Sequence, residues 1–343
     1  GKVDAKSIYK AIYELEYNDV KWNNSSNKML LYLRENDQEA LDYIAFAKTC
    51  SEFNMSDSDW EVEPREKFER NKKILEALKK SQQVKSEIIK KRYRFLAVRL
   101  AYYNQDEDRV NSIYEKSFVG SPKDAIDYWA YYFKTTTEKI SAERNYKLAQ
   151  VFVNAPGKRF GVLTRFSREI PLDEVLKFAT TNTERANVHL MYAVRERGRG
   201  LATLKKVQKL DPKHPLLDYL LIREVNKLED WILTPRYTNF DPTVDNRRET
   251  YDESNELIKQ RIADDEKYGR EVADWISSLN IKTNKTWNLA GAYLKGITGN
   301  PQGALAILNS ANDYPKGQQQ LINRIKLLFN VRKNAATKLT IDE

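Results

Sequence analysis

The sequence predicts an all-α fold of stacked helical hairpins with a superhelical surface. Residues 93–100 and 126–133 repeat one spacing of large and small apolar side chains, 33 residues apart. In each copy a small residue, Ala97 or Ala130, lets two helices approach closely while large residues fill the space beside it. Such a hairpin cannot bury its apolar face alone, so stacked neighbours are expected. Only 12 Gly and 10 Pro in 343 residues argue against a loop-rich β protein.

The first 63 residues predict a group of N-terminal helices. Ile8 and Ile12 lie four residues apart, as on one face of a helix, and Leu41 and Ile44 begin a second amphipathic stretch. We therefore expect two or three helices before residue 64, outside the repeats.

The repeats are expected at 64–233 and begin with a long helical run. Pro64 opens this run, and its apolar side chains stay near one side of a helix as far as Leu100. Residues 81–83 are polar, so we expect the run to break there into two helices. The net charge of +9 lies in this part of the chain, because residues 64–104 hold 13 Lys or Arg and 4 Glu.

Two helices at 122–134 and 139–153 form the best-defined repeat. Ser121 followed by proline gives this repeat an N-cap and a first helical position. The interval 157–170 is expected to be irregular. A further helical pair at 184–209 is followed by an Asp-Pro sequence, which closes a repeat because the residue before a proline disfavours helical geometry.

A linker is predicted at 234–246, where two prolines and several turn-forming residues stop any helix. The C-terminal segment, 247–343, predicts a long helix at 248–279, a terminal pair of repeat helices and a capping helix at 317–332. The chain therefore divides into N-terminal helices, repeats, a linker and a C-terminal helical segment.

These spacings resemble the tetratricopeptide (TPR) motif, a helical hairpin with small residues at fixed positions. The matching residues of the two clearest repeats are Ile126, Trp129, Ala130, Phe133, Ala142, Tyr146 and Ala149, and Trp287, Ala290, Gly291, Leu294, Ala304, Leu308 and Ala311. The resemblance covers roughly half of the chain, and Gly200 departs from it where the family has Ala. It implies a TPR-like right-handed α-α superhelix, a solenoid of helical hairpins that presents a groove to another macromolecule.

The resemblance also implies which residues face that groove. They are Arg94, Asp127, Tyr131, Lys134, Asn288 and Lys295. A tyrosine among charged side chains suits a bound peptide, because the ring supplies contact area at a low entropic cost and the charges fix the register. The alternative is that each of these side chains simply packs within the fold.

A second candidate site is the basic run itself. If 64–104 is treated as one continuous helix, its lysines gather on about a third of the circumference. They include Lys72, Lys73, Lys79, Lys80, Lys90 and Lys91. Such a basic face could bind an anionic polymer, a nucleic acid or a membrane surface. The alternative is a solvated outer face, and the aromatic residues lie with the apolar set rather than among the lysines, which weakens the case for nucleic acid.

No motif in the sequence supports an enzyme. His189 and His214 lack metal-ligand spacing, and Cys50 is the single cysteine, so we expect no metal and a buried structural thiol. Neither a phosphate-binding glycine loop nor a nucleophile elbow occurs. Gly198 and Gly200 follow a helix, which predicts a helix-ending turn, and we expect no cofactor.

A second resemblance concerns the compartment. Residues 221–231, followed by Thr234 and Pro235, resemble a feature of uncharacterised TPR-like proteins from Bacteroidetes-type bacteria, which implies a protein of the bacterial cell envelope or a secreted one. The chain opens at Gly1 without Met, so we expect a processed form that has lost its leader. No run approaches the about 18–20 apolar residues of a membrane-spanning helix. A cytoplasmic protein is the alternative.

The hypothesis from the sequence is a non-catalytic scaffold whose helical-repeat groove binds a protein or peptide partner. The alternative is a protein that binds an anionic polymer, a nucleic acid or a membrane surface through the basic face at 64–104.

Overall fold

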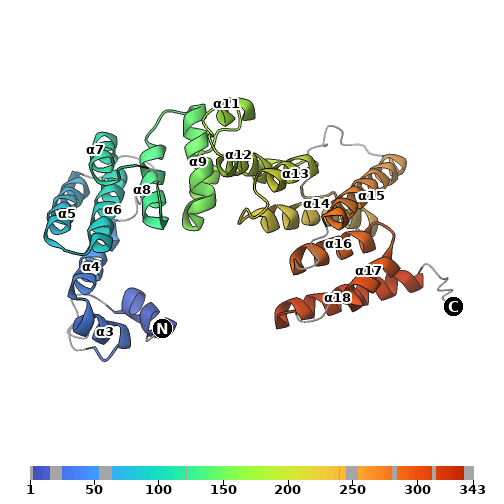
Figure 1. Ribbon diagram of the computed structural model, residues 1–343, viewed down its shortest axis with the longest axis horizontal. Helices are drawn as coiled ribbons and strands as arrows, with labels where there is room; N and C mark the ends of the chain where they lie inside the picture. The colour runs from blue at the N-terminus through green and yellow to red at the C-terminus, as the bar shows by residue number, and fades with distance from the viewer. Residues whose placement is uncertain are drawn as a thin grey trace. The chain divides into compact units, whose positions relative to one another are not determined.

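The computed structural model describes eight stretches of the chain, and all regular secondary structure in them is helical (Figure 1). The stretches are 3–15, 25–53, 64–120, 122–238, 240–244, 254–279, 284–310 and 314–335. The predicted all-α class is confirmed. The chain forms two compact units, Gly1–Phe178 and Ala179–Glu343, and their boundary falls inside the segment 64–233 that the sequence assigns to one series of repeats.

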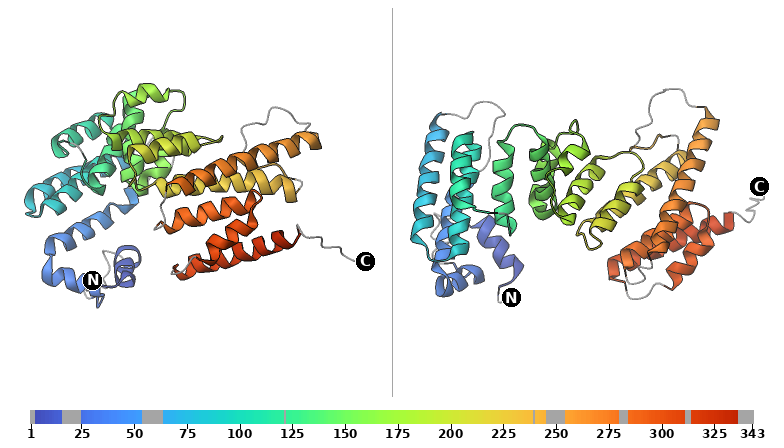
Figure 2. Two further views of the ribbon diagram at one scale, coloured as in Figure 1. Left: turned by 45° about the vertical axis from the view of Figure 1, so that its right-hand side comes forward. Right: turned by 45° about the horizontal axis from the view of Figure 1, so that its top comes forward.

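The first unit is a succession of helices that pack in chain order. They are α1 (Ala5–Tyr9), the π-helical η1 (Lys10–Glu14), α3 (Lys28–Asn36), α4 (Gln38–Thr49), η2 (Ser51–Phe53), α5 (Pro64–Gln83), α6 (Glu87–Tyr103), α7 (Glu107–Ser117), α8 (Ala125–Thr136), α9 (Ala142–Asn154), η3 (Pro156–Lys158), α10 (Arg159–Arg165) and α11 (Leu172–Leu176). Helices α5, α6 and α8 lie side by side (Figures 1 and 2), and α8 packs in turn on α7 and α9. The interval 157–170, expected to be irregular, contains α10.

The predicted break of the basic run is confirmed, although it comes a few residues later than expected. Helix α5 continues through Gln83, and α6 begins after its N-cap Ser86. The carboxylate of Glu39 on α4 fixes the turn, because it accepts hydrogen bonds from the backbone N–H groups of Lys85 (2.7 Å) and Ser86 (2.8 Å). Helix α6 therefore folds back against α5, and residues 64–104 are two packed helices rather than one.

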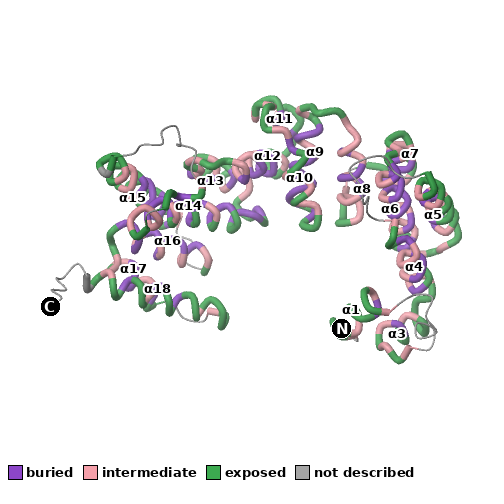
Figure 3. The backbone as a smooth tube through the Cα atoms, turned by 180° about the vertical axis from the view of Figure 1, so that it is seen from behind, coloured by how far each residue is buried: buried purple, intermediate pink, exposed green. Residues whose placement is uncertain are grey.

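The core of the first unit lies among α6, α8 and α9. Ala97, Ala130 and Ala149 are fully buried, and the large side chains of Leu100 and Phe133 are buried as well. The predicted role of small residues at close helix contacts is consistent with this burial. Figure 3 shows that α6 is largely buried, whereas α5 keeps many exposed residues.

Helix α8 begins three residues later than predicted. Its N-cap is Asp124, whose Oδ1 accepts hydrogen bonds from the N–H groups of Ile126 (2.9 Å) and Asp127 (3.0 Å). In return Asp127 Oδ2 accepts from the Asp124 N–H (3.3 Å). This reciprocal arrangement is a capping box, and it sets the start of α8 at Ala125. The predicted cap, Ser121, lies outside the described residues.

The second unit contains seven helices in its described part. They are α12 (Asn182–Arg195), α13 (Leu201–Leu210), α14 (Leu217–Tyr237), α15 (Asn255–Ser278), α16 (Lys285–Ile297), α17 (Pro301–Asn309) and α18 (Lys316–Ala335). Helix α15 packs on α14 and α16, and α17 packs on α16 and α18. The predicted terminal helix pair and capping helix are present. The long helix starts at 255 rather than 248, because Ser254 caps it.

The predicted start of the linker at 234 is wrong, because α14 continues through Pro235 to Tyr237. Pro235 lies in the last turn, where its missing N–H removes a single backbone hydrogen bond. The end of α14 is stabilised by a neighbouring helix, because Arg236 forms an ion pair with Glu266 of α15 at 2.6 Å. Tertiary packing here outweighs the local preference of proline. Residues 245–246 of the predicted linker lie outside the described part of the chain.

Candidate functional site

Aromatic side chains from successive helices line one side of the first unit. They are Tyr114 of α7, Tyr131 of α8, Tyr146 of α9 and Phe178 after α11, and they are called the tyrosine stripe below. The ring centroids of Tyr114 and Tyr131 are 6.1 Å apart, and those of Tyr146 and Phe178 are 6.4 Å apart. Tyr146 also acts electrostatically on Tyr131. Tyr114 is buried, whereas Phe178 is 41% exposed and Tyr131 and Tyr146 are half-buried, so three of the four rings present part of their area to solvent.

The hydroxyl groups of Tyr114 and Tyr131 stay protonated at neutral pH. Burial raises the pKa of Tyr114 to about 12 and also raises the pKa of Tyr131. Neither phenol therefore supplies a phenolate base near pH 7. The chemistry open to the stripe is apolar contact through the rings and hydrogen bonding through the neutral hydroxyls.

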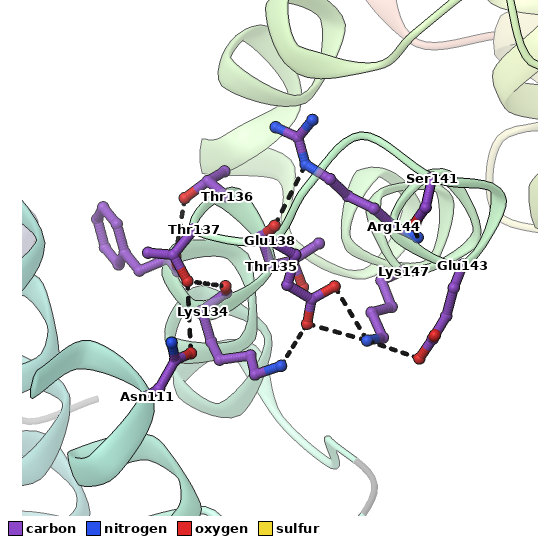
Figure 4. A network of polar contacts seen from close by, with 11 residues as sticks. Asn111, Lys134, Thr135, Thr136, Thr137, Glu138, Ser141, Glu143, Arg144 and Lys147 are labelled. Atoms are coloured by element: carbon purple, nitrogen blue, oxygen red, sulfur yellow. Dashed lines mark hydrogen bonds and ion pairs between the residues drawn. The ribbon is translucent and has the colours of Figure 1, made fainter. Parts of the chain in front are cut away.

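Four charged side chains form a network beside the stripe (Figure 4). Glu138 accepts hydrogen bonds from Lys134 and from Lys147 (2.9 and 3.0 Å), and Lys147 pairs with Glu143 at 2.8 Å. Both glutamates act electrostatically on Tyr131. Burial acts to lower the pKa of Lys147, but its bonds to Glu143 and Glu138 outweigh burial and raise this pKa. This charge network of Lys134, Glu138, Glu143 and Lys147 is neutral as a whole.

The sequence resemblance predicts two members of this site, Tyr131 and Lys134, which lie three residues apart on one side of α8. It also contains an unused signal for the charge network. Lys134 and Glu138, like Glu143 and Lys147, are four residues apart, the spacing at which opposite charges meet on a helix. No comparable signal points to Phe178, because its contact with Tyr146 depends on how α11 packs on α9.

Asp127, a third predicted groove residue on α8, takes part in the helix start. Besides the capping box, its Oδ1 pairs with Lys91 of α6 at 2.9 Å. Arg94 is half-buried on α6. Asn288 and Lys295 are half-buried on α16 of the second unit, so the six predicted groove residues are divided between the two units.

The basic face predicted at 64–104 is not a single helical surface, because the turn at 84–86 separates its residues. Five of its six lysines contact other side chains of the chain: Lys72 with Glu69, Lys73 with Thr49, Lys80 with Glu76, Lys90 with Glu87 and Lys91 with Asp124. Lys79 is exposed. Some of these lysines also point apart, since Lys73 lies over the Phe46 ring of α4 at 5.4 Å and Lys91 reaches α8. The face therefore offers less uncompensated charge than the sequence suggests.

The His214 and Cys50 side chains are buried inside the fold. His214 Nε2 lies 2.8 Å from Asn187 Oδ1, its Nδ1 accepts from the Leu216 N–H (3.2 Å), and burial lowers its pKa. Burial raises the pKa of Cys50 to about 11, so this thiol is protonated at neutral pH. Within the described stretches, no group of three or more His, Cys, Asp or Glu is placed to hold a metal ion.

The glycine turn at 198–200 joins α12 to α13, as predicted, and side chains of α14 fill it. Glu224 accepts a hydrogen bond from the Gly200 N–H (2.9 Å), and Lys227 donates to the Gly198 carbonyl. Glu224 and Lys227 are also a buried ion pair. Because a carboxylate of the chain already occupies the Gly200 amide, this turn is not a phosphate cradle.

Comparison of the chain with protein-family models, with curated proteins and with solved structures gave no match. No helix in the described stretches is both long enough and apolar enough to cross a membrane.

Proposed function

We propose that this chain is a non-catalytic, TPR-like scaffold whose tyrosine stripe binds an extended peptide segment of a partner protein. The observation that supports this proposal is the placement of the partly exposed rings of Tyr131, Tyr146 and Phe178 beside the charge network. A right-handed superhelix and a place in the bacterial cell envelope belong to the same proposal, and they rest on the sequence resemblances.

The spacing of the rings suits an extended peptide. Alternate side chains of an extended strand lie about 6.6 Å apart, since each residue advances about 3.3 Å. The centroid separation of the partly exposed pair Tyr146 and Phe178, 6.4 Å, is close to this repeat. Alternate apolar side chains of a peptide can therefore contact successive rings, which supply rigid area at a low cost in side-chain entropy.

The charge network suits an acidic residue in the same peptide. Glu138 accepts from two lysines, so Lys134 can turn to a carboxylate of the partner while Lys147 continues to neutralise Glu138. A charge-assisted hydrogen bond of this kind contributes about 1.5–3 kcal/mol. We therefore expect the preferred peptide to carry one Asp or Glu next to alternating apolar residues.

The test is selection of peptides from a random displayed library against the full chain, followed by fluorescence anisotropy on the selected sequences. Tyr131→Ala is expected to raise Kd about 30-fold, which corresponds to about 2 kcal/mol for a central aromatic contact. Lys134→Glu is expected to raise Kd at least about tenfold. Lys79→Glu, on the exposed side of α5, is the matched control and is expected to leave Kd unchanged.

Far-UV circular dichroism of each variant establishes that the helices are intact. If the selected peptides bind Tyr131→Ala and Lys134→Glu as tightly as the wild-type chain, the stripe is not the binding surface and the proposal fails.

A further inference from the structure

The opposite side of α8 carries a second set of aromatic residues. At about 100° per residue, the centre of the set Trp129, Tyr132 and Phe133 lies about half a turn from the centre of the pair Tyr131 and Lys134. Tyr132 and Phe133 are buried, and Trp129 is half-buried. This side of α8 faces other neighbours than the tyrosine stripe does, and its charges are arranged differently.

A lysine lies over these rings. The ammonium nitrogen of Lys158, in η3, is 4.3 Å from the ring centroid of Phe133, 5.3 Å from that of Tyr132 and 5.7 Å from that of Trp129. Three ring faces around one ammonium group form a cation–π arrangement, which favours the charged amine.

Two glycines bring the backbone of η3 and α10 directly onto the rings. A Cβ added at Gly157 would touch the Trp129 ring at 3.5 Å, and one added at Gly161 would overlap the hydroxyl group of Tyr132. Since the backbone can come no closer, the position of Lys158 over the rings is fixed by packing and not only by its own flexible side chain.

The charges around Lys158 are of one sign. The charged group that acts on Lys158 is Arg99 of α6, which is also a cation. Arg165 donates a hydrogen bond to the Tyr102 hydroxyl (2.6 Å) and another to Tyr132. Residues 155–168 contain four Lys or Arg and no Asp or Glu. The charge network near Tyr131 is neutral, whereas these cations have no such balance.

Two N–H groups in the same place lack an acceptor. Arg99 Nε and Trp129 Nε1 are buried and have no hydrogen-bond partner among the described residues. A buried donor without an acceptor is unfavourable, and such groups are rare in folded proteins. An anion near Lys158 would bring both acceptor oxygens and the missing negative charge.

We propose that this cluster binds a phosphate-class oxyanion, either free phosphate or a phosphate monoester. The Lys158 cluster comprises Arg99, Trp129, Tyr132, Phe133, Lys158 and Arg165. Arginine binds phosphate through its planar fork and lysine binds it as a point charge, so the pair suits one compact dianion. The site is reachable, because Arg165 is exposed and Arg99 and Lys158 are half-buried. Lys158 already covers the ring faces, so stacking of nucleobases is disfavoured there.

The titration of Lys158 gives the site a recognisable pH dependence. Burial, together with the charge of Arg99, lowers the pKa of Lys158 to about 8. Bound dianion favours the protonated amine, so affinity falls as pH rises through this value. The protonated fraction changes from about nine-tenths at pH 7 to about one-tenth at pH 9, which predicts a roughly tenfold loss of affinity. The other groups that face the site do not titrate in this interval, because Arg99 and Arg165 stay charged and burial raises the pKa of Tyr132.

The test is isothermal titration calorimetry of the full chain with inorganic phosphate and with phenyl phosphate, at low salt and at pH 7 and 9. Phenyl phosphate stays largely a dianion over this range, so we expect its saturable binding at pH 7 to weaken about tenfold at pH 9. Lys158→Met keeps the apolar volume over the rings and is expected to abolish binding, whereas Lys158→Arg is expected to restore binding and to remove the pH dependence. Lys116→Met, at an exposed lysine of α7, is the control and is expected to leave binding unchanged.

The two ligands distinguish the sources of the oxyanion. Tighter binding of phenyl phosphate identifies a monoester, and equal or tighter binding of inorganic phosphate identifies the free ion. Absence of saturable binding to either ligand, or binding that is the same in Lys158→Met and in the wild-type chain, overturns the proposal. Circular dichroism and the Lys158→Arg variant separate loss of the site from loss of the fold.

Discussion

Replacing one buried glycine should loosen the last helix of the second unit. Gly296 on α16 is buried against Phe329 of α18, a side chain with no exposed surface. A Cβ at Gly296 would lie under 3.0 Å from three carbons of the Phe329 ring, whereas ordinary contacts begin at about 3.4 Å. The ring is enclosed and cannot swing into solvent, so the two helices must separate or the ring must leave its preferred rotamer.

The expected net destabilisation from Gly296→Ala is about 1–2 kcal/mol. Overpacking of a core typically costs about 1–3 kcal/mol. The change from Gly to Ala inside a helix stabilises the folded state by about 0.5–1 kcal/mol, which offsets part of this cost. The control is Gly317→Ala, on α18 itself, where an added Cβ meets nothing within 4 Å and a small gain in stability is expected.

Urea unfolding followed by circular dichroism measures the change in free energy, and hydrogen exchange read by mass spectrometry shows where it occurs. Faster exchange is expected in α18 and in the adjoining part of α16. A second variant, Gly296→Ala with Phe329→Leu, should recover part of the loss, because the smaller side chain makes room for the methyl group. Wild-type stability in Gly296→Ala would refute the reasoning, because it would mean that α16 and α18 do not pack as described.

Three further predictions concern the first unit. Asp124→Ala removes the cap of α8 and is expected to lower the free energy of unfolding by about 1 kcal/mol, as measured by urea titration; an unchanged midpoint would contradict the capping role. Because the backbone N–H groups of Lys85 and Ser86 lower the pKa of Glu39, the stability that Glu39 supplies is complete above its ordinary pKa and is lost as pH falls through the lowered value. Glu39→Gln should therefore reduce the urea midpoint at pH 7 and have little effect near pH 3, and an equal effect at both would count against the turn. Burial raises the pKa of Cys50 to about 11, so iodoacetamide at pH 8 should alkylate it about a hundredfold more slowly in the folded chain than in urea; comparable rates would show an accessible thiol.

The helices were predictable because their cause is local. The spacing of Ala97 and Ala130 among large apolar residues predicts close helix contacts, and both side chains are fully buried. The ends of helices were less predictable. Asp124 sets the start of α8 by bonding to nearby backbone amides, and Arg236 holds the turn of α14 that contains Pro235 through a contact with α15. Only the first of these causes can be found in the local sequence.

The contacts of the candidate sites also divide into those that follow from sequence spacing and those that depend on tertiary packing. Lys134 and Glu138 are four residues apart in the sequence and meet at the end of α8, but the approach of Tyr114 to Tyr131 depends on how α7 packs against α8. The Lys158 cluster has no local signal, since Arg99 and Lys158 are far apart in the chain and meet only through the packing of η3 on α8. Sequence spacing finds partners one helical turn apart, and it does not find partners that tertiary packing brings together.

The bond between Lys91 and the start of α8 has a consequence for how the first unit folds. The ammonium group of Lys91, on α6, binds both carboxylates of the capping box, Asp124 at 2.8 Å and Asp127 at 2.9 Å. The two negative charges at the start of α8 are therefore neutralised by a cation from α6, an earlier helix of the same unit. Nearest-neighbour coupling of this kind links the growth of one hairpin to the completion of the hairpin before it. A fragment that begins after α6 would lack Lys91 and therefore this ion pair. Its first remaining hairpin would lose the coupling to the hairpin before it, and its unfolding would be less cooperative.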